Sequence, residues 1–473
     1  MDKRTKIVAT IGPSASSPKT LKAMVKEGVN VFRINFSHGS HDDHIKAIEI
    51  IRQVDQDLGT HTALLADLQG PKIRIGEMPK EGLMLQNKQD FYLTTLKKHS
   101  LDAAAYISLE QLPRDVKKGE KILLDDGKIH LEVIETNKKD TVKTKVIAGG
   151  ILYSRKGVNL PDTNISVSSL TKKDKKDLKV AIDQDVDWIG FSFVRSAREV
   201  IELKHMISNL NGNAKVIAKI EKPEAVDDLN AILEETDAVM VARGDLGVEI
   251  PLEKVPIIQK KIVNMAQDLA KPVIIATQMM ESMMDSLTPS RAEVNDVANS
   301  IIDGADAVML SGETSVGKYP VEVIKQISKI IDSVEYSSLI KVPENPPTIK
   351  TNRYITKAIC YHASHMADEI NAKAIMTLTN SGYTAFQISA WRPHSNILVF
   401  TSNKRILNRL SLLWGVKAFY YNKFSSTDIT IEEITEIATK EGYISKGDFT
   451  ISLAAMPIKA KGMVNTLRVN QVT

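Results

Sequence analysis

A lysine and a glutamate stand two positions apart inside an otherwise apolar stretch, AKVIAKIE. Residues two apart in a strand point the same way, so Lys219 and Glu221 share a face. Burying an ammonium among Val, Ile and Ala is costly unless the group is paired or used. Two interpretations stay open: a structural ion pair, or an electrophilic ammonium beside a metal-binding carboxylate.

A second acid, Asp245, follows in the glycine turn of ARGDLG. We expect Glu221 and Asp245 to come from neighbouring strands. Two carboxylates completed by water and substrate oxygens suit Mg²⁺, which rarely takes a full cage of protein ligands. The alternative is a pair of solvated turn acids.

The segment RINFSHG places Arg33, Asn35 and Ser37 on one side of a strand. Arg33 suits bidentate binding of a phosphate. Oxygens of Asn35, Ser37 and Asp67 suit a hard cation such as K⁺ or Mg²⁺, and the alternative is a hydrogen-bond cluster at the strand end. His38, taken alone, is more typical of a structural or surface histidine than of an acid–base catalyst.

The stretch LLADLQGPKIRIG ends an apolar run in an acid, Asp67. The chain then turns at Gly70-Pro71, and two cationic residues, Lys72 and Arg74, follow directly. The lysine is therefore expected to be aimed back towards the acid.

Most of these residues follow short apolar runs that have the length of strands buried on both faces. Eight such runs, most of them separated by amphipathic helices, favour a TIM (β/α)8 barrel, and a doubly wound open sheet is the alternative. Strand ends of a barrel open into one mouth, which would also receive Ser192, Arg243, Thr277, Ser311 and Glu313. A threonine at a strand end, such as Thr277, is often only structural. The runs span residues 6–12, 31–37, 62–69, 187–194, 214–221, 237–243, 272–278 and 305–311.

About 100 residues separate the third and fourth runs, where a helix of about 12 would suffice. Their alternating pattern and an Asp126-Gly127 turn predict an all-β domain, residues 71–166, inserted at Gly70-Pro71. The barrel then comprises residues 1–70 and 167–345. A proline-rich joint, KVPENPPTIKTN, leads to a C-terminal α/β domain, residues 346–473.

The C-terminal domain contains TLTNSGYTA, in which a strand is followed by hydroxyls, a glycine and the start of a helix. Free backbone N–H groups there would form an anion cradle, and simple N-capping is the alternative. The residues concerned are Thr379, Ser381, Gly382 and Thr384.

Composition limits the remaining classes of function. The net charge of +4 over 473 residues gives no general reason to expect nucleic acid or a membrane surface. The one cysteine, Cys360, excludes an intramolecular disulfide and Cys/His zinc clusters. With no apolar signal core and no run of 18 apolar residues, we expect a cytoplasmic protein.

Five long motifs closely resemble pyruvate kinase: VIAKIEKPEAV, VMVARGDLGVEIP, IIATQMMESM, RAEVNDVANSIIDGADAVMLSGETSVGKYP and FRINFSHG. The resemblance covers nearly the whole chain, including the insertion and the C-terminal domain. It implies the last step of glycolysis, transfer of the phosphoryl group of phosphoenolpyruvate to ADP, with Mg²⁺ (or Mn²⁺) as cofactor. It also implies an allosteric homotetramer and an inserted domain that closes as a lid, excluding water from the site.

The family's roles carry over by position. Lys219 and Arg33 would stabilise the transferring phosphoryl group, and Glu221 and Asp245 would hold Mg²⁺. The phosphoenolpyruvate pocket would be lined by Gly244, Asp245 and Thr277, with Thr277 near the carbon that gains a proton. The proton donor stays open, with Thr277 acting through water, and Ser311 and Glu313 behind it, as our prediction. The nucleotide would contact Asn35, Ser37, His38, Arg74 and Lys156.

One departure from the family concerns K⁺. Many members have DTKGPE where this chain has DLQGPK, so a glutamate occupies the position of Lys72. Those members bind K⁺ at positions that match Asn35, Ser37, Asp67 and Leu68. Because Leu68, Gln69 and Ile75 also differ in the direction of K⁺-independent members, we predict activity without K⁺, with Lys72 replacing the ion.

A second departure concerns the effector. The residues of TLTNSGYTA fit the family's phosphate loop, but the final loop, MPIKAKGMVNTLRV, lacks the glycine-rich form associated with fructose 1,6-bisphosphate control. Lys459 and Lys461 remain available for a phosphate. We expect a sugar phosphate or a nucleotide monophosphate as effector.

Two other functions compete. A metal-dependent barrel lyase or aldolase would share the acidic pair but would not need the lid or Lys156. A catalytically silent metabolite sensor would be expected to lack Lys219, Glu221 or Asp245, and all three are present.

Overall fold

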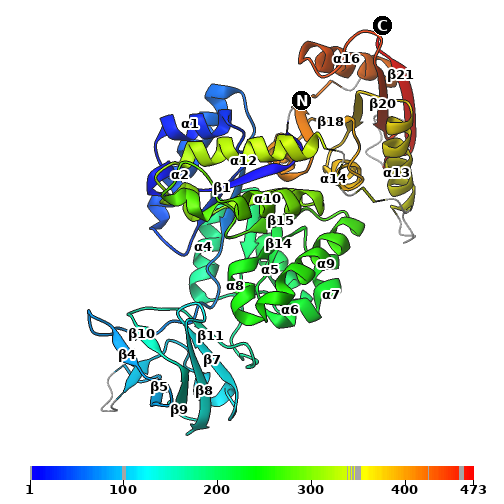
Figure 1. Cartoon of the computed structure of the whole chain (residues 1–473). Coiled ribbons are helices and arrows are strands. Elements are labelled where there is room, and N and C mark those ends of the chain that lie inside the picture. Colours follow the sequence, from blue (N-terminus) through cyan, green and yellow to red (C-terminus); the bar gives the residue numbers. More distant parts are fainter. Residues whose placement is uncertain are drawn as a thin grey trace.

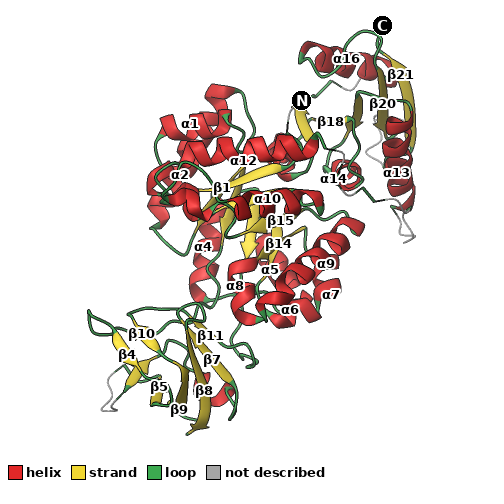
Figure 2. Cartoon of the chain, viewed as in Figure 1, coloured by secondary structure: helices red, strands yellow, loops and turns green. Residues whose placement is uncertain are grey.

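The computed structural model describes residues 3–97, 103–337, 339–340, 342–343, 346, 353–423, 426–456 and 463–473. A barrel ringed by helices occupies the middle of the molecule (Figure 1). A strand-rich region lies below it, and a helix-and-sheet region lies at the upper right (Figure 2).

Eight parallel strands close into a barrel, in the order β1-β16-β15-β14-β13-β12-β3-β2. This closure confirms the TIM barrel and excludes the doubly wound open sheet. The observed strands are shorter than the apolar runs. They are β1 (Lys6–Thr10), β2 (Val31–Asn35), β3 (Ala63–Asp67), β12 (Trp188–Phe191), β13 (Lys215–Ile220), β14 (Ala238–Ala242), β15 (Val273–Ala276) and β16 (Ala307–Leu310).

Helices surround the barrel and bury their apolar faces against its strands. They are α1 (Pro18–Lys26), α2 (His41–Leu58), α4 (Lys172–Asp183), α5 (Ala197–Asn209), α6 (Pro223–Asp227), α7 (Leu229–Glu235), α8 (Arg243–Glu249), α9 (Val255–Asp268), α10 (Arg291–Ile302), α11 (Gly312–Ser315) and α12 (Pro320–Glu335). Short 3₁₀ turns lie at η1 (Pro13–Ala15), η2 (Leu252–Lys254) and η3 (Glu281–Met284).

The N-terminus of α4 also fixes the chain where it leaves β3. Thr171 caps the helix and Asp174 completes a capping box, so their side chains and backbone satisfy one another. Asp174 Oδ1 in addition accepts the Gly70 N–H at 3.0 Å. The turn at Gly70, where φ is 68°, is therefore anchored to a barrel helix.

The described part of the inserted region, which lies between β3 and α4, is all-β apart from one short helix, and it has a core of its own. Six strands pair in the order β11-β7-β8-β9-β5-β6, and β10 pairs with β4. Asp125, Asp126 and Gly127, all with positive φ, make the turn between β7 and β8. The elements are β4 (Leu83–Leu85), β5 (Asp90–Thr94), β6 (Ala104–Tyr106), α3 (Leu112–Asp115), β7 (Lys121–Leu124), β8 (Ile129–Thr136), β9 (Thr141–Ala148), β10 (Gly150–Leu152) and β11 (Val158–Asn159).

The C-terminal region is an α/β sheet in the order β19-β18-β17-β20-β21, in which only β21 runs antiparallel. It packs on the barrel, because Leu412 and Phe386 join the cluster of side chains inside the barrel strands. Its elements are α13 (Tyr354–Glu369), β17 (Ala374–Leu378), α14 (Tyr383–Ala390), β18 (Asn396–Thr401), α15 (Lys404–Arg409), η4 (Leu410–Leu412), β19 (Val416–Tyr420), α16 (Thr427–Lys440), β20 (Phe449–Ala454) and β21 (Thr466–Gln471). Over the described ranges, no helix has both the length and the apolar character needed to cross a membrane.

Candidate active site

Lys219 lies near the carboxyl end of β13, in the mouth of the barrel. Its Nζ donates to Ser192 Oγ at 2.7 Å and lies 3.2 Å from Asp67 Oδ1 and 3.0 Å from Glu221 Oε1. Burial alone would lower the pKa of Lys219, but the Asp67 and Glu221 carboxylates raise that pKa above its usual value. The site therefore holds a buried, permanently charged ammonium.

Arg33, from β2, approaches the same carboxylate from another strand. Its Nε and Nη2 both lie 2.7 Å from Asp67 Oδ2, and its Nη1 donates to Thr10 Oγ1 at 3.1 Å. Burial alone would raise the pKa of Asp67, but Lys219 and Arg33 hold that pKa below its ordinary range. Asp67 thus orients two cations in the mouth.

Glu221, directly after β13, is almost completely buried, and its Oε2 accepts the Phe193 N–H at 2.8 Å. Burial raises the pKa of Glu221 to about 7, Lys219 opposes this rise, and the neighbouring Asp245 charge adds to it. Two carboxylates that repel each other fit a divalent cation. In the part of the chain that the structure describes, no cluster of three or more His, Cys, Asp or Glu is arranged for a metal. Two carboxylates completed by water and substrate oxygens are a ligand set that suits Mg²⁺.

Thr277 follows β15 with a φ of 70°, a strained conformation for a β-branched residue. Its Oγ1 accepts the Gly244 N–H at 2.8 Å, which ties β15 to the start of α8. Arg243 donates to the Thr277 carbonyl at 2.7 Å and pairs with Asp296 at 2.6 Å. Strain of this kind persists where the surroundings enforce it, and it is concentrated at active sites.

Ser311 and Glu313 lie after β16, at the last strand end. Both carboxylate oxygens of Glu313 accept backbone N–H groups, those of Ser311 at 2.7 Å and Met280 at 3.1 Å. Glu313 is also buried. Its contacts brace the loops after β15 and β16.

The oxygens expected to bind a monovalent cation already have protein donors. Asn35 Oδ1 accepts the Ser37 N–H at 3.0 Å, and the Leu68 carbonyl accepts Ser192 Oγ at 2.6 Å. Asp67 already neighbours two cations. The positive charge of Arg33 and Lys219 thus already lies beside these oxygens.

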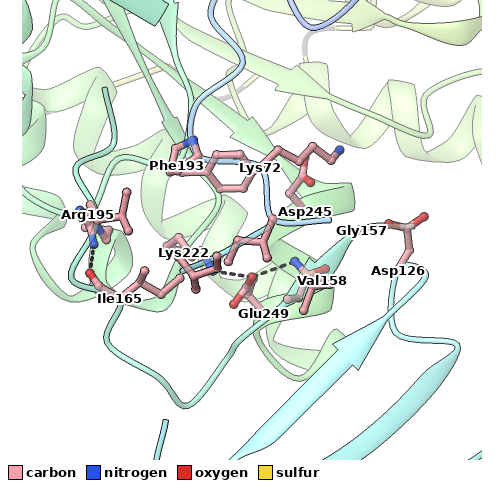
Figure 3. Close-up of a pocket in the computed structure, with 15 residues that line it drawn as sticks. Lys72, Asp126, Gly157, Val158, Ile165, Phe193, Arg195, Lys222, Asp245 and Glu249 are labelled. Atoms are coloured by element: carbon pink, nitrogen blue, oxygen red, sulfur yellow. Dashed lines mark hydrogen bonds and ion pairs between the residues drawn. The ribbon is translucent and has the colours of Figure 1, made fainter. Parts of the chain in front are cut away.

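Lys72 does not point back to Asp67 as we expected. The side chain is exposed, and the structure gives it no ion pair with any described residue. Figure 3 shows Lys72 beside Phe193, on a cleft that Asp245 also lines. The contact with Asp67 is absent because that carboxylate is enclosed by Arg33 and Lys219.

The predicted nucleotide residues come from two regions. Arg74 and Lys156 belong to the inserted region, where Arg74 donates to the Arg155 carbonyl at 3.0 Å and Lys156 pairs with Asp125 at 2.8 Å. Asn35, Ser37 and the exposed His38 lie at the end of β2. Within the described ranges, no hydrogen bond or ion pair links these two groups, so the structure does not bring them together.

The predicted effector loop starts α14. Gly382 has a φ of 82° and donates its N–H to Thr379 Oγ1 at 3.0 Å, while the exposed Ser381 accepts the Tyr383 N–H at 3.4 Å. Thr384 is buried. Local capping therefore accounts for part of this loop, and Lys459 and Lys461 lie outside the described residues.

Sequence reasoning missed some residues around the site. Thr10 ends β1, so the strand-end rule that found Arg33 also predicts it. Lys222, Glu249 and Asn159 form one cluster between the barrel and the inserted region. Nothing in their spacing signals this contact, since it joins three separate segments.

Comparison with known proteins agrees with this geometry. Residues 2–324 match the family described as pyruvate kinase, barrel domain, and residues 357–470 match pyruvate kinase, alpha/beta domain. The chain is 42% identical to pyruvate kinase 2 of Synechocystis sp. over 477 residues, covering 100% of this chain and 80% of that protein. It is 41% identical to pyruvate kinase of Corynebacterium glutamicum over 471 residues, covering 99% and 98%. A crystal structure of a pyruvate kinase from Cryptosporidium parvum matches with a TM-score of 0.91 at 32% identity, covering 100% of this chain and 97% of that one. The chain belongs to the pyruvate kinase family.

Proposed function

We propose that the barrel mouth around Lys219 carries out the family's reaction, transfer of the phosphoryl group of phosphoenolpyruvate to ADP, giving pyruvate and ATP. The observation that carries the assignment is the buried Lys219 ammonium, which contacts Asp67, Ser192 and Glu221. A fixed cation in a water-poor site stabilises charge that spreads over phosphoryl oxygens during transfer.

Arg33 and Lys219 act electrostatically on the phosphoryl group. Because Asp67 holds both, their positions are set before substrate binds, and little reorganisation is needed during the reaction. Mg²⁺ held by Glu221 and Asp245 would neutralise charge on the substrate oxygens. The three groups together would surround the phosphoryl oxygens with positive charge, without any covalent intermediate.

Thr277 is our proposed residue for the proton step. Its Oγ1 lies at the start of α8 beside Gly244 and Asp245, where the three-carbon part of the substrate would bind. A hydroxyl there can hold a water and pass a proton to the carbon that becomes the methyl group of pyruvate. Glu313 would brace the neighbouring loops instead of donating the proton itself.

The inserted region would act as a lid. We propose domain boundaries at 1–70 and 167–345 for the barrel, 71–166 for the lid and 346–473 for the C-terminal domain. Arg74 and Lys156 would then meet nucleotide phosphates from the lid side, and Asn35, Ser37 and His38 from the barrel side. For Lys156 this requires exchanging Asp125 for the nucleotide, because that carboxylate is its present partner.

Independence from K⁺ is part of the proposal. Its support is that the oxygens of Asn35, Asp67 and Leu68 already have protein donors, and that Lys72 carries a fixed charge on the lid connection. Lys72 is exposed in this structure, so its role would begin when the connection moves on lid closure. The homotetramer, the cytoplasmic location and a phosphorylated effector at Thr379, Ser381, Gly382 and Thr384 remain predictions from the family resemblance.

The test is ATP formation from phosphoenolpyruvate and ADP with Mg²⁺. Lys219→Met, which keeps the length of the side chain without its charge, should lower kcat by at least about 10²-fold. Lys215→Met is the matched control. Lys215 begins the strand that Lys219 is near the end of, and it pairs there with Asp237. Pyruvate release that does not depend on ADP would instead favour the lyase or aldolase.

A further inference from the structure

A buried ion pair on the barrel receives a hydrogen bond from the inserted region. Lys222 Nζ lies 2.6 Å from Glu249 Oε1, with side-chain exposures of 9% and 1%. Asn159, in β11, donates its Nδ2–H to the same oxygen at 2.8 Å. Figure 3 shows Lys222 and Glu249 pointing toward each other at the cleft, joined by a dashed line.

The described part of the barrel does not supply hydrogen-bond donors to both carboxylate oxygens of Glu249. Glu249 Oε2 is buried and has no hydrogen-bond partner among the described residues. A buried carboxylate that lacks donors is unfavourable, so a donor arriving from outside the barrel is stabilising. Asn159 supplies a donor to the other oxygen of this carboxylate, Oε1, and Oε2 stays without one within the described ranges. A hydrogen bond to a charged acceptor is stronger than one to a neutral acceptor.

The same two regions also approach each other at a second point. Gly127, in the turn between β7 and β8, lies so that an added Cβ would be 3.6 Å from Val248 Cγ1. Val248 precedes Glu249 in α8, and β11 pairs with β7. The hairpin turn and Asn159 therefore approach one short helix of the barrel together.

Helix α8 and the segment that contains Lys222 also carry the two proposed metal ligands. Asp245 stands four residues before Glu249 in α8, close to one turn away. Lys222 directly follows Glu221. Both members of the ion pair are thus attached, through short and rigid backbone, to the two carboxylates of the candidate Mg²⁺ site.

We propose that Asn159, Glu249 and Lys222 form a latch that keeps the lid docked on the barrel, so that only a further closing movement is needed to complete the nucleotide site. These three are positioning residues: Asn159 acts through the placement of Arg74 and Lys156 on the lid, and the Lys222–Glu249 pair is its anchor on the barrel. The inference rests on the proposed function, because nucleotide binding is its readout. If ADP binds only when the lid is docked, loss of the latch lowers the fraction of molecules that can bind ADP. The apparent dissociation constant for ADP then rises in proportion.

The decisive variant is Asn159→Ala. We expect the KM for ADP to rise about tenfold, while the KM for phosphoenolpyruvate stays within about twofold, because the phosphoryl-binding residues Arg33 and Lys219 lie on the barrel alone. Hydrogen exchange should also become faster in residues 121–136 and 243–249. An unchanged KM for ADP together with unchanged exchange would overturn the latch.

Two further variants separate the latch from general loss of stability. Asn137→Ala removes a side chain that orders the turn between β8 and β9 through backbone N–H groups, without reaching the barrel. It should leave the KM for ADP near the wild-type value, and an equal rise would contradict the proposal.

The double variant Asn159→Asp with Glu249→Gln exchanges donor and acceptor, and it should recover most of the affinity for ADP that is lost in Asn159→Asp alone. Wild-type ATP formation in the same assay tests the proposed function separately, so the two failures are distinguishable.

Discussion

Lys219 and Asp67 form an ion pair between strands that are not neighbours in the barrel. Their closest distance is 3.2 Å, and β12 lies between their strands in the closed order. Ser192, just after β12, receives a hydrogen bond from Lys219 and donates to the Leu68 carbonyl. Three consecutive strands of the barrel are thus tied together by one small polar network at their carboxyl ends.

Removing the charge of Asp67 should disturb two catalytic cations at once. Asp67→Asn leaves Arg33 and Lys219 without their shared carboxylate, so we expect kcat to fall by about 10²-fold. The measurement is steady-state ATP formation, with circular dichroism to show that the barrel is folded. Asp90→Asn is a suitable control, since Asp90 pairs with two lysines on the surface of the inserted region. Wild-type kcat in Asp67→Asn would remove the proposed role of this network.

The hydroxyl of Thr277 should matter more than its methyl group. Thr277→Val should lower kcat by about 10²-fold, because it removes the proposed proton relay and the acceptor for the Gly244 N–H. Thr277→Ser keeps that oxygen, and its kcat should remain within about tenfold of wild type. Exchange of the pyruvate methyl protons in D₂O measures the proton step by itself. Equal exchange rates for Thr277→Val and wild type would exclude this residue as the relay.

K⁺ should have little effect on the wild-type enzyme. We expect similar kcat values in K⁺, Na⁺ and tetramethylammonium buffers of equal ionic strength. Lys72→Glu should create K⁺ activation, because the substitution replaces a fixed positive charge with a negative one near the cleft. Lys80→Glu makes the same change at an exposed lid position and serves as the control. Strong K⁺ activation of the wild type would contradict the proposed role of Lys72.

Lys271 predicts a pH dependence of stability in alkaline solution. Burial lowers the pKa of Lys271 from 10.5 to about 8 in the folded protein. Between these values the unfolded chain binds more protons than the folded one, so the free energy of unfolding gains a contribution that rises with pH. Lys271→Met removes this contribution, which we put at up to about 2 kcal/mol after allowing for partial exposure.

Urea unfolding of wild type and Lys271→Met at the two ends of this pH window measures the difference. Lys179→Met is the comparison, since Lys179 is exposed and pairs only with Asp183 along its own helix. If the difference between wild type and Lys271→Met does not change with pH, Lys271 makes no contribution to the pH dependence of stability.

The sequence alone determined the barrel and the kinds of residue in its mouth. Apolar runs of strand length alternate with helices, and parallel strands place every polar end at one rim, so Arg33, Lys219 and Thr277 could be assigned to one site. The spacing of Lys219 and Glu221 likewise fixed their common face, because side chains alternate along a strand. The length of the insertion and its turn residues identified a separate all-β region.

Tertiary structure decided which of these side chains meet. Asp67 pairs with Lys219 across β12 because closure of the barrel sets the stagger between strands, and no local pattern contains that stagger. Lys72 faces outward because Arg33 and Lys219 already enclose Asp67. The contact of Asn159 with Glu249 joins residues 90 positions apart through the packing of two separate cores. Local periodicity sets the face on which a residue lies, while the partner of that residue depends on how whole domains dock.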